Sequence, residues 1–320
     1  MRLNGQEPLF GVNLPYFGTA YGHDLAPNAQ HPGWGEECTP LLAFRTLAAC
    51  RLLGFGAVRI WLCECGEGLD RDPRGRVSAA APELLRGIEL VQQGARMLGL
   101  RIYWSLLDGN SWQRDQDELT GRIFAEPASQ EAFCERAVEP IAAVLDPELA
   151  FAVEIVNEPE SLSSEVHPQR GLEWARIRDA LARMRESVHR MLPGVPVTAG
   201  CQAVFLPGLL AGPPCVDAVD LHVYHPDGGL PDRKDLPVDI GELPLWAGEC
   251  GLAERGQGSH YLLHYLYNAR ALPYRAAFLW KLAGDEHLLR FRPERMHAPG
   301  LYEYTPLGGE VQHFLTSAWV

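Results

Sequence analysis

The sequence predicts an α/β protein with a single (β/α)8 barrel, or TIM barrel, that spans residues 1–320. Apolar strand-like runs alternate along the chain with amphipathic helix-like segments, which is typical of a parallel sheet. There are eight such runs, and we find no linker, low-complexity tract or repeat between them. Eight parallel strands in fewer than about 330 residues fit a closed barrel better than an open sheet.

The predicted strands are rich in β-branched, Leu and aromatic residues, as buried strands are. They cover residues 9–13, 57–62, 101–107, 150–157, 195–200, 217–224, 244–249 and 276–282. The segments between them show helical periodicity, and only short or irregular links follow the fifth and sixth strands. The predicted helices cover about residues 40–54, 81–99, 129–145, 171–192 and 259–272.

Composition excludes some classes of partner. The chain is 47% hydrophobic and 22% charged, with a formal net charge of −13, and its basic residues are scattered. Nucleic acids and anionic membranes require clustered Lys and Arg, so neither is expected as a partner. No apolar stretch approaches the roughly 18 residues that a membrane-spanning helix needs.

Eight cysteines raise the question of disulfides. Most lie inside predicted helices or strands, and the N-terminal stretch MRLNGQEPLFGVN lacks the apolar run of a signal peptide. We therefore expect free thiols and a cytoplasmic location. The Cys63-x-Cys65 pair is open to a metal or redox interpretation, but a structural zinc site usually has four ligands, so free thiols are favoured.

Two acidic residues stand where apolar strands end. The stretch AVEIVNEPE, residues 152–160, ends with Asn157 and Glu158, and LPLWAGECG, residues 243–251, contains Glu249. In a (β/α)8 barrel the active site lies at the C-terminal ends of the strands. We therefore expect the two glutamates to be partners.

Other polar side chains are predicted to point into the barrel. In the sixth strand Asp220, His222 and Tyr224 share one face, while the apolar residues between them share the other. The second strand likewise directs Arg59 and Trp61 inward. A buried arginine needs a carboxylate partner, so the interior of the barrel is expected to hold an ion pair.

The chain resembles the retaining (β/α)8 glycoside hydrolases, the clan of cellulases and β-mannanases, and most closely family 5. The resemblance lies in these motifs, in chain order: Arg59, VNEP, HVY, WAGECG and Trp280. The strand order extends this resemblance over essentially the whole chain. Its most specific parts contain Glu158 and Glu249, which are 91 residues apart. The resemblance implies hydrolysis of β-glycosidic bonds in oligosaccharides or small β-glycosides of the β-mannoside or β-glucoside type.

The resemblance also implies roles for individual residues. Retaining glycosidases use a carboxyl pair about 5–5.5 Å apart, one member as acid/base and the other as nucleophile. Glu158 matches the acid/base, expected to begin protonated, and Glu249 matches the nucleophile. The implied substrate-binding residues are Arg59, Asn157, His222, Tyr224 and Trp280. Asn157 would bind the sugar 2-hydroxyl, Arg59 and Tyr224 would keep Glu249 ionised, and no metal or cofactor is implied.

One strand end departs from the pattern. Many relatives have a histidine after the third strand, where this chain offers Ser105, Asp108, Asn110 and Trp112. The sugar, the linkage, endo or exo action, transglycosylation and the oligomeric state therefore stay open. Residues of the long first loop are candidates for outer sugar subsites or for ordinary solvated loop: His23, Asp24, Trp34, Glu36 and Glu37.

Two other functions are compatible with these residues. A metal-dependent barrel of the sugar-isomerase type would use Glu158, Asp220, His222 and Glu249 as ligands. An inward Arg59 would compete with the cation. A non-catalytic carbohydrate-binding barrel is the other, although a binder has no use for a pair of costly buried carboxylates.

Overall fold

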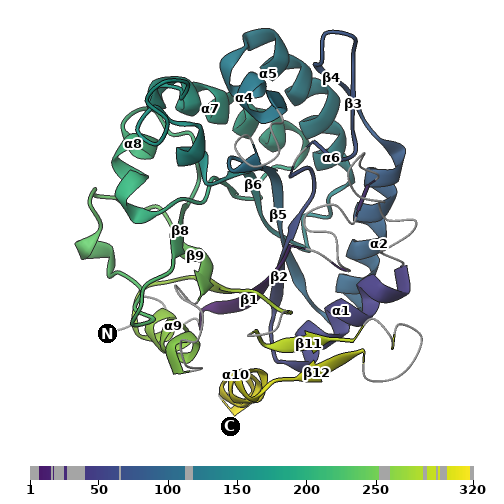
Figure 1. Cartoon of the computed structure of the whole chain (residues 1–320), viewed down its shortest axis with the longest axis vertical. Helices are drawn as coiled ribbons and strands as arrows, with labels where there is room; N and C mark the ends of the chain where they lie inside the picture. Colours follow the sequence, from purple (N-terminus) through teal and green to yellow (C-terminus); the bar gives the residue numbers. More distant parts are fainter. Residues whose placement is uncertain are drawn as a thin grey trace.

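The computed structural model has a central parallel sheet of eight strands surrounded by helices (Figure 1). The strands of the sheet are β1 (Leu9–Leu14), β2 (Ala57–Trp61), β5 (Arg101–Asp108), β6 (Ala150–Asn157), β7 (Val197–Thr198), β8 (Val219–Val223), β9 (Leu245–Gly251) and β10 (Ala276–Trp280). The structure describes residues 7–15, 17, 25–26, 40–64, 66–111, 118–251, 260–283, 287–292, 295 and 301–317.

The strands pair in the order β7-β6-β5-β2-β1-β10-β9-β8, and every pair is parallel. The two ends of this order also meet, because Cys201, just after β7, forms a parallel bridge with Leu221 of β8. The Cys201 N–H donates to the Asp220 carbonyl, and the His222 N–H donates to the Cys201 carbonyl at 2.9 Å. The predicted (β/α)8 barrel is confirmed, and all eight predicted strands are present.

Helices connect the strands as the periodicity predicts. They are α1 (Pro40–Leu52), α2 (Pro82–Leu98), α4 (Glu118–Ala125), α5 (Pro127–Phe133), the π-helical turn η1 (Cys134–Val138), α6 (Glu139–Val144), α7 (Trp174–Met191), α8 (Leu206–Leu210), α9 (His260–Ala271) and α10 (Pro306–Ser317). The predicted helix at 129–145 is the continuous run from α5 to α6. The short links expected after the fifth and sixth strands are also present. A 3-10 turn at Ala203–Phe205 and the short helix α8 follow β7, and a 3-10 turn at Arg233–Asp235 follows β8.

Two hairpins and the last helix were not predicted. The antiparallel pair β3 (Leu69–Arg71) and β4 (Val77–Ala80) follows β2, and β11 (Leu289–Phe291) pairs with β12 (Tyr302–Tyr304) before α10. Figure 1 places β11 and β12 beside α1 and α10, on the outside of the barrel. Their strands have only three or four residues, too few for a clear alternation of apolar and polar positions.

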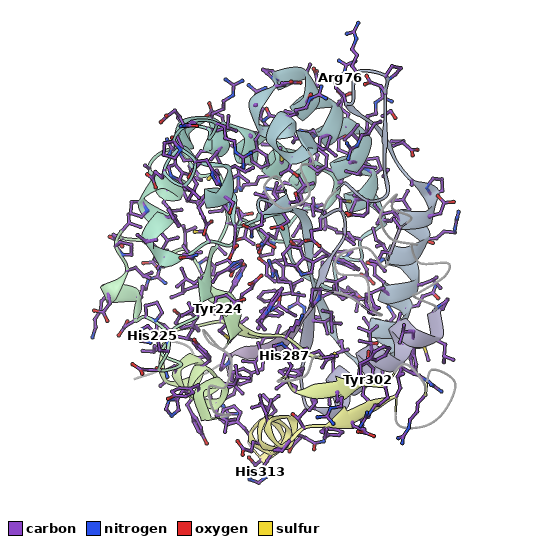
Figure 2. All side chains as sticks on the ribbon, viewed as in Figure 1. Arg76, Tyr224, His225, His287, Tyr302 and His313 are labelled. Carbon is purple, nitrogen blue, oxygen red and sulfur yellow. The ribbon has the colours of Figure 1, made fainter. Side chains whose placement is uncertain are left out.

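The interior contains two separate apolar regions. The larger lies between the strands and the helices, and the smaller closes one end of the barrel with Ala57, Ala152, Ala218, Ala276, Tyr103, Trp246 and Phe278. In this barrel floor small side chains leave room for large rings, whose centroids lie 5.4 Å apart for Tyr103 and Phe278. Side chains fill the space between the ribbons in Figure 2, so the barrel is a packed core and not a pore.

None of the helices in the described ranges is long and apolar enough to cross a membrane.

The barrel floor gives a test of the fold. Phe278 is fully buried, so Phe278→Ala should lower the free energy of unfolding by about 3–5 kcal/mol, since it removes a ring that the neighbouring strands cannot replace. Urea denaturation followed by circular dichroism measures the change. Met97→Ala is the control, because Met97 is 76% exposed and its loss should change stability by less than about 0.5 kcal/mol. Equal stability of the two variants would contradict this packing.

Candidate active site

Glu158 and Glu249 come together at the C-terminal ends of their strands. Glu158 directly follows β6, and Glu249 lies in β9. One carboxylate oxygen of each and a ring nitrogen of His222 all lie within 4.8 Å of one another. The side chain of Glu158 is 19% exposed and that of Glu249 is 5% exposed, so both border an opening and not the deep core.

Both oxygens of Glu249 accept strong hydrogen bonds. Arg59 Nη1 donates to Oε1 at 2.6 Å, and the Tyr224 hydroxyl donates to Oε2 at 2.6 Å. The cation and the phenol therefore fix this carboxylate from two sides. Arg59 and Tyr224 lie beside Glu249 as the resemblance implied.

Arg59 is the central anchor of the site and is fully buried. Its Nη2 lies 2.5 Å from Glu154 Oε2 and 2.8 Å from Asn157 Oδ1, and its Nη1 donates to Asn13 Oδ1 at 2.8 Å. Burial opposes the charge of the guanidinium, but Glu154 and Glu249 outweigh it and raise the pKa of Arg59 well above its usual range. This one side chain connects β1, β2, β6 and β9.

Glu158 is ionised in this arrangement, which differs from the expectation that it begins protonated. His222 Nδ1 lies 3.1 Å from Oε1, and Asn110 Nδ2 donates to Oε2 at 2.5 Å. Burial alone would raise the pKa of Glu158, but the hydrogen bond and charge of His222, then Asn110 and Arg59, lower it to about 2. The physical reason for the difference is the neighbouring imidazole, which holds the proton in its place.

His222 is the second buried cation of the site, with only 3% of its surface exposed. Burial disfavours the charged ring, but Glu249 and the hydrogen bond to Glu158 raise the pKa of His222 to about 10. Nδ1 also lies 3.8 Å from Glu249 Oε2. The lowered pKa of Glu158 and the raised pKa of His222 both favour a charged imidazole beside an ionised carboxylate.

The backbone of Glu158 is held in an unusual conformation. Its φ of 49° and ψ of 61° lie in the left-handed region, which non-glycine residues rarely adopt. The Gly109 N–H donates to the Asn157 carbonyl at 2.8 Å, and the Glu158 N–H donates to the Gly200 carbonyl at 2.8 Å. A β-carbon at position 109 would lie 2.3 Å from the Glu158 carbonyl oxygen, so only glycine permits this approach.

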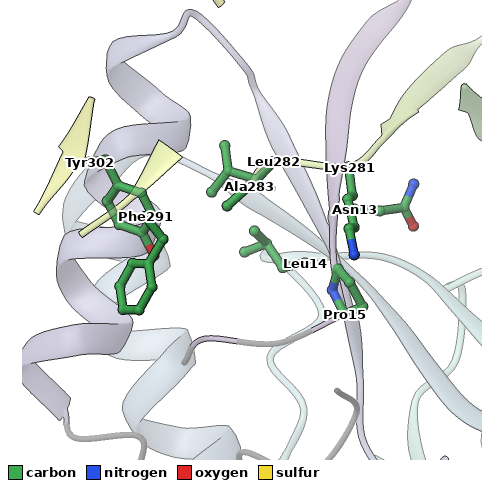
Figure 3. A pocket seen from close by; sticks show the side chains of 8 residues that line it. All are labelled: Asn13, Leu14, Pro15, Lys281, Leu282, Ala283, Phe291 and Tyr302. Carbon is green, nitrogen blue, oxygen red and sulfur yellow. The ribbon is translucent and has the colours of Figure 1, made fainter. Parts of the chain in front are cut away.

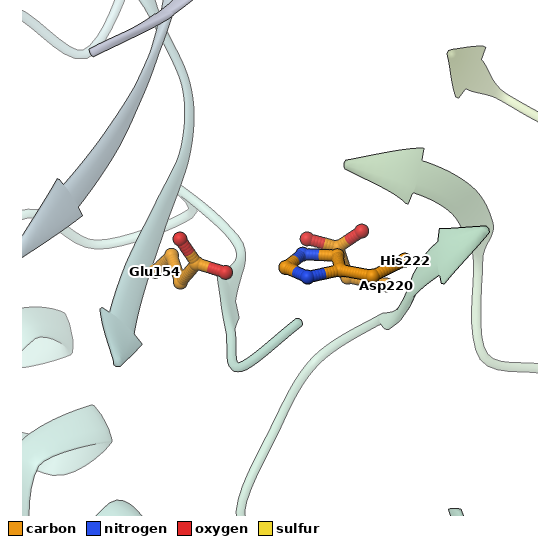
Figure 4. Close-up of side chains that lie close together, drawn as sticks. All are labelled: Glu154, Asp220 and His222. Carbon is orange, nitrogen blue, oxygen red and sulfur yellow. The ribbon is translucent and has the colours of Figure 1, made fainter. Parts of the chain in front are cut away.

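Below the two glutamates lies a second group of titratable side chains. Glu154 from β6 and Asp220 and His222 from β8 face one another in Figure 4, and one polar atom of each lies within 4.8 Å of the others. Asp220 accepts hydrogen bonds from the Tyr103 hydroxyl and the Gly248 N–H. Burial raises the pKa of Asp220 to about 6.

A metal ion at these residues would meet a competing cation. A β-carbon at Gly200 would lie 2.3 Å from His222 Nε2, 2.8 Å from Glu154 Oε1 and 2.9 Å from Asp220 Oδ2, so the three side chains converge on a point that only glycine leaves free. Arg59 also lies against Glu154 and Glu249 as a permanent cation. The geometry disfavours the sugar-isomerase alternative.

The remaining predicted site residues lie at the C-terminal ends of their strands, Asn157 in β6 and Trp280 in β10. Asn157 is 4% exposed; its amide oxygen accepts from Arg59, and its Nδ2 donates to Asp108 at 2.9 Å, which leaves one N–H for another partner. Trp280 pairs in register with Gly251, two residues beyond Glu249. Its ring meets that of Trp61 edge to face, with centroids 6.4 Å apart. The structure thus groups all seven predicted site residues.

Several residues of the site were not singled out from the sequence. Glu154 is the main omission; a lone glutamate within the apolar run of the fourth strand was the signal for a buried ion pair. Asn13, Tyr103 and Glu160 carried no comparable signal, because their partners come from distant strands. Asn110 was noted at the third strand end, but its hydrogen bond to Glu158 depends on the conformation of the loop.

Other sequence predictions fall outside the described residues. These are the candidate subsite residues His23, Asp24, Trp34, Glu36, Glu37 and Trp112, and also Cys38 and Cys65. The described cysteines are buried free thiols, as expected: Cys50, Cys63, Cys134, Cys201, Cys215 and Cys250. Burial raises the pKa of the Cys63 thiol well above its usual range, which makes it unreactive.

Cavities in the described residues do not locate a sugar site by size. The small cavity in Figure 3, between Asn13 and Lys281 on one side and Phe291 and Tyr302 on the other, has a volume of about 10 Å³, enough for about one water molecule. A hollow of about 570 Å³ lies on the outside, between α9 and α10, and is lined by none of the site residues.

Comparison with known proteins finds the same fold in glycoside hydrolases. The chain aligns with an endo-1,4-β-mannanase from Eisenia fetida at 17% identity and a TM-score of 0.69, covering 98% of this chain and 92% of that one. A GH5_18 protein from Streptomyces cattleya, solved in complex with Manβ1-4GlcNAc, aligns at 16% identity and 0.70, over 98% and 81%.

An exo-β-1,4-mannosidase from an Opitutaceae bacterium, strain TAV5, aligns at 18% identity and a TM-score of 0.66, over 99% of this chain and 61% of that one. At these identities the likeness concerns the fold. No family model matches the chain, and no curated protein matches its sequence.

The Arg59 anchor predicts a pH-dependent loss of stability. Arg59→Met leaves the buried carboxylates of Glu154 and Glu249 without their cation, which should lower the free energy of unfolding at pH 7 by about 3–5 kcal/mol. Protonation neutralises a buried carboxylate that has lost its cation, so the deficit of the variant should shrink as the pH falls from 7 towards 4.

Urea denaturation at several pH values measures this deficit. Arg59→Met/Glu154→Gln is the matched control, because it removes one of the unpaired charges and should recover part of the stability at pH 7. A deficit that stays the same at every pH, or a double variant no more stable than the single one, would show that Arg59 acts by packing alone.

Proposed function

We propose that the protein is a retaining β-glycoside hydrolase, with Glu249 as nucleophile and Glu158 as acid/base. The observation that carries this proposal is the pair of carboxylates at the ends of β6 and β9, with one oxygen of each within 4.8 Å of the other. Their hydrogen-bond partners differ, because Glu249 is bound by Arg59 and Tyr224 and Glu158 by His222. Such a separation suits double displacement, because an inverting pair needs room for a water molecule and lies about 6.5–9.5 Å apart.

Glu249 suits the role of nucleophile. Its ionised carboxylate attacks the anomeric carbon, and its two hydrogen bonds, from Arg59 and Tyr224, hold it in one orientation while it does so. The guanidinium is itself fixed by Glu154, Asn13 and Asn157, so the nucleophile needs no reorganisation at the moment of reaction. The products of this step are a glycosyl ester of Glu249 and a leaving group that needs a proton.

That proton comes from the Glu158 and His222 pair. The His222 Nδ1–H bond breaks as the proton passes to Glu158 Oε1, and Glu158 gives it to the departing glycosidic oxygen as the carbon–oxygen bond breaks. In the second step ionised Glu158 removes a proton from water, whose oxygen attacks the anomeric carbon and releases Glu249. The pair then regains its proton, so each turnover adds one water across the glycosidic bond.

The substrate we propose is a short β-linked oligosaccharide or small β-glycoside of the β-mannoside or β-glucoside type. The second N–H of Asn157 is available to a sugar hydroxyl beside Glu158, and Trp280 offers a flat surface for a sugar ring. The neighbours of the same fold include mannanases, and a further neighbour, the GH5_18 protein, was solved in complex with Manβ1-4GlcNAc. β-Mannosides are therefore the first substrates to test.

The roles of the two glutamates predict different rescue products. On an aryl glycoside that departs without a proton, Glu158→Ala should form the glycosyl-enzyme and then stall, because no base activates water. Azide should restore turnover and give the β-glycosyl azide after two inversions. With Glu249→Ala, azide enters the vacated space, displaces once and gives the α-azide. Proton NMR of the products distinguishes the anomers.

Circular dichroism of each variant provides the control for folding. Glu160→Ala is a matched variant, since it also removes a carboxyl from the same turn but should give no glycosyl azide. If both glutamate variants gave the same anomer, or if neither responded to azide while each remained folded, the two roles would be wrongly assigned.

The proposed substrate predicts the outcome of a panel of glycosides. Nitrophenyl β-mannoside, nitrophenyl β-glucoside, manno-oligosaccharides and Manβ1-4GlcNAc should include a substrate, whereas nitrophenyl α-mannoside should not be hydrolysed. The first product seen by NMR should be the β-anomer, and excess chelator should leave the rate unchanged. Release of the α-anomer first would show inversion, and loss of activity with chelator would return the metal-dependent alternative.

A further inference from the structure

A third carboxyl lies behind the Glu158 and His222 pair and has no part in the mechanism above. Glu160 stands two residues after Glu158 in the 3-10 turn η2, Pro159–Leu162, and is 3% exposed. Its carbonyl accepts from both the N–H and the hydroxyl of Ser163, at 2.9 and 2.7 Å. The same turn therefore holds both carboxyls in place.

The carboxyl group of Glu160 is only half satisfied. Oε1 accepts from the Gln202 N–H at 3.0 Å, whereas Oε2 is buried and has no hydrogen-bond partner in the part of the chain that the structure describes. A buried carboxylate with an unpaired oxygen is unstable, so the group is poised to carry a proton. Burial raises the pKa of Glu160 to about 7, and the charge of Glu158 adds to this effect.

The titratable groups that interact with the Glu160 carboxyl lie on or just after three strands. Glu158 after β6 raises the pKa of Glu160, and His222 on β8 lowers it. The thiol of Cys201, after β7, is also affected, because Glu160 contributes to its raised pKa. Coupling between sites is reciprocal, so an ionised Glu160 must in turn strengthen the hold of Glu158 and His222 on a proton.

We propose that Glu160 is a positioning residue whose buried charge sets how strongly the Glu158 and His222 pair holds its proton. The turn fixes Glu158 through the hydrogen bond from the Ser161 N–H to its carbonyl, and the Gln202 contact ties the turn to the end of β7. Above about pH 7 the negative charge of Glu160 keeps the pair protonated. The consequence for the rate rests on the proposed function, since only a hydrolase needs that proton.

The sharpest variant is Glu160→Gln. The glutamine oxygen still accepts from the Gln202 N–H, and the side chain resembles the protonated acid, so below about pH 6 the variant should match the wild type. Above pH 7 it lacks the negative charge. The midpoint for loss of the His222 proton, and with it the alkaline limb of kcat/KM, should fall by about one pH unit, while the acid limb stays in place.

Two measurements separate this inference from the proposed function. In the protein without substrate, 13C NMR of labelled glutamate carboxyls reports the titration of Glu160, and 15N NMR of the imidazoles reports that of His222. The pH profile of kcat/KM on an accepted aryl glycoside then reports the proton of the pair during reaction. Glu165→Gln is the matched control, because Glu165 is an exposed acid of the same loop, and its loss should change neither measurement.

A purely structural role would give a different result. It would leave Glu160→Gln like the wild type at every pH, and only Glu160→Ala, which leaves the Gln202 N–H without an acceptor, would lose activity. An unmoved His222 midpoint in Glu160→Gln, or a Glu160 carboxyl that titrates near the ordinary value of about 4.3, overturns the inference. If the midpoint moves but the wild type cleaves no glycoside, the coupling stands and the proposed function fails.

Discussion

The site depends on one buried cation. Arg59 extends from β2 into the barrel and is paired on one side with Glu154 and on the other with Glu249, while Asn13 and Asn157 accept its remaining donors. Removing one partner of a buried ion pair leaves the other charge buried and uncompensated, which is strongly destabilising. The guanidinium and its two carboxylates therefore depend on one another. The same side chain therefore orients Glu249 and holds β1, β6 and β9 together.

The His222 ring lies between two pairs of acids. Its Nδ1 faces Glu158 and Glu249 at the opening, and its ring lies beside Glu154 and Asp220 towards the floor. The arrangement explains why two glutamates at similar strand ends differ, since Glu249 is bound to a permanent cation and Glu158 to one that can lose its proton.

The elements of the barrel could be predicted because each depends on local pattern. Buried parallel strands need continuous apolar runs, and the helices outside need a helical apolar stripe, so both leave periodic signals in the sequence. The seven predicted site residues could be placed because strand ends in a barrel converge on one opening. The short hairpins β3-β4 and β11-β12 were missed because three or four residues leave no such signal.

The sequence by itself determined the strand order, the inward faces of the second and sixth strands and the presence of two acids at strand ends, because these follow from residue types and spacing along the chain. Only the tertiary structure decided how charge is distributed among them. The pairing of Arg59 with Glu154, the hydrogen bond between Glu158 and His222 and the burial of Glu160 all depend on residues from different strands. Such interactions depend on distances of a few ångströms and on the exclusion of water, and neither is written in the order of residues.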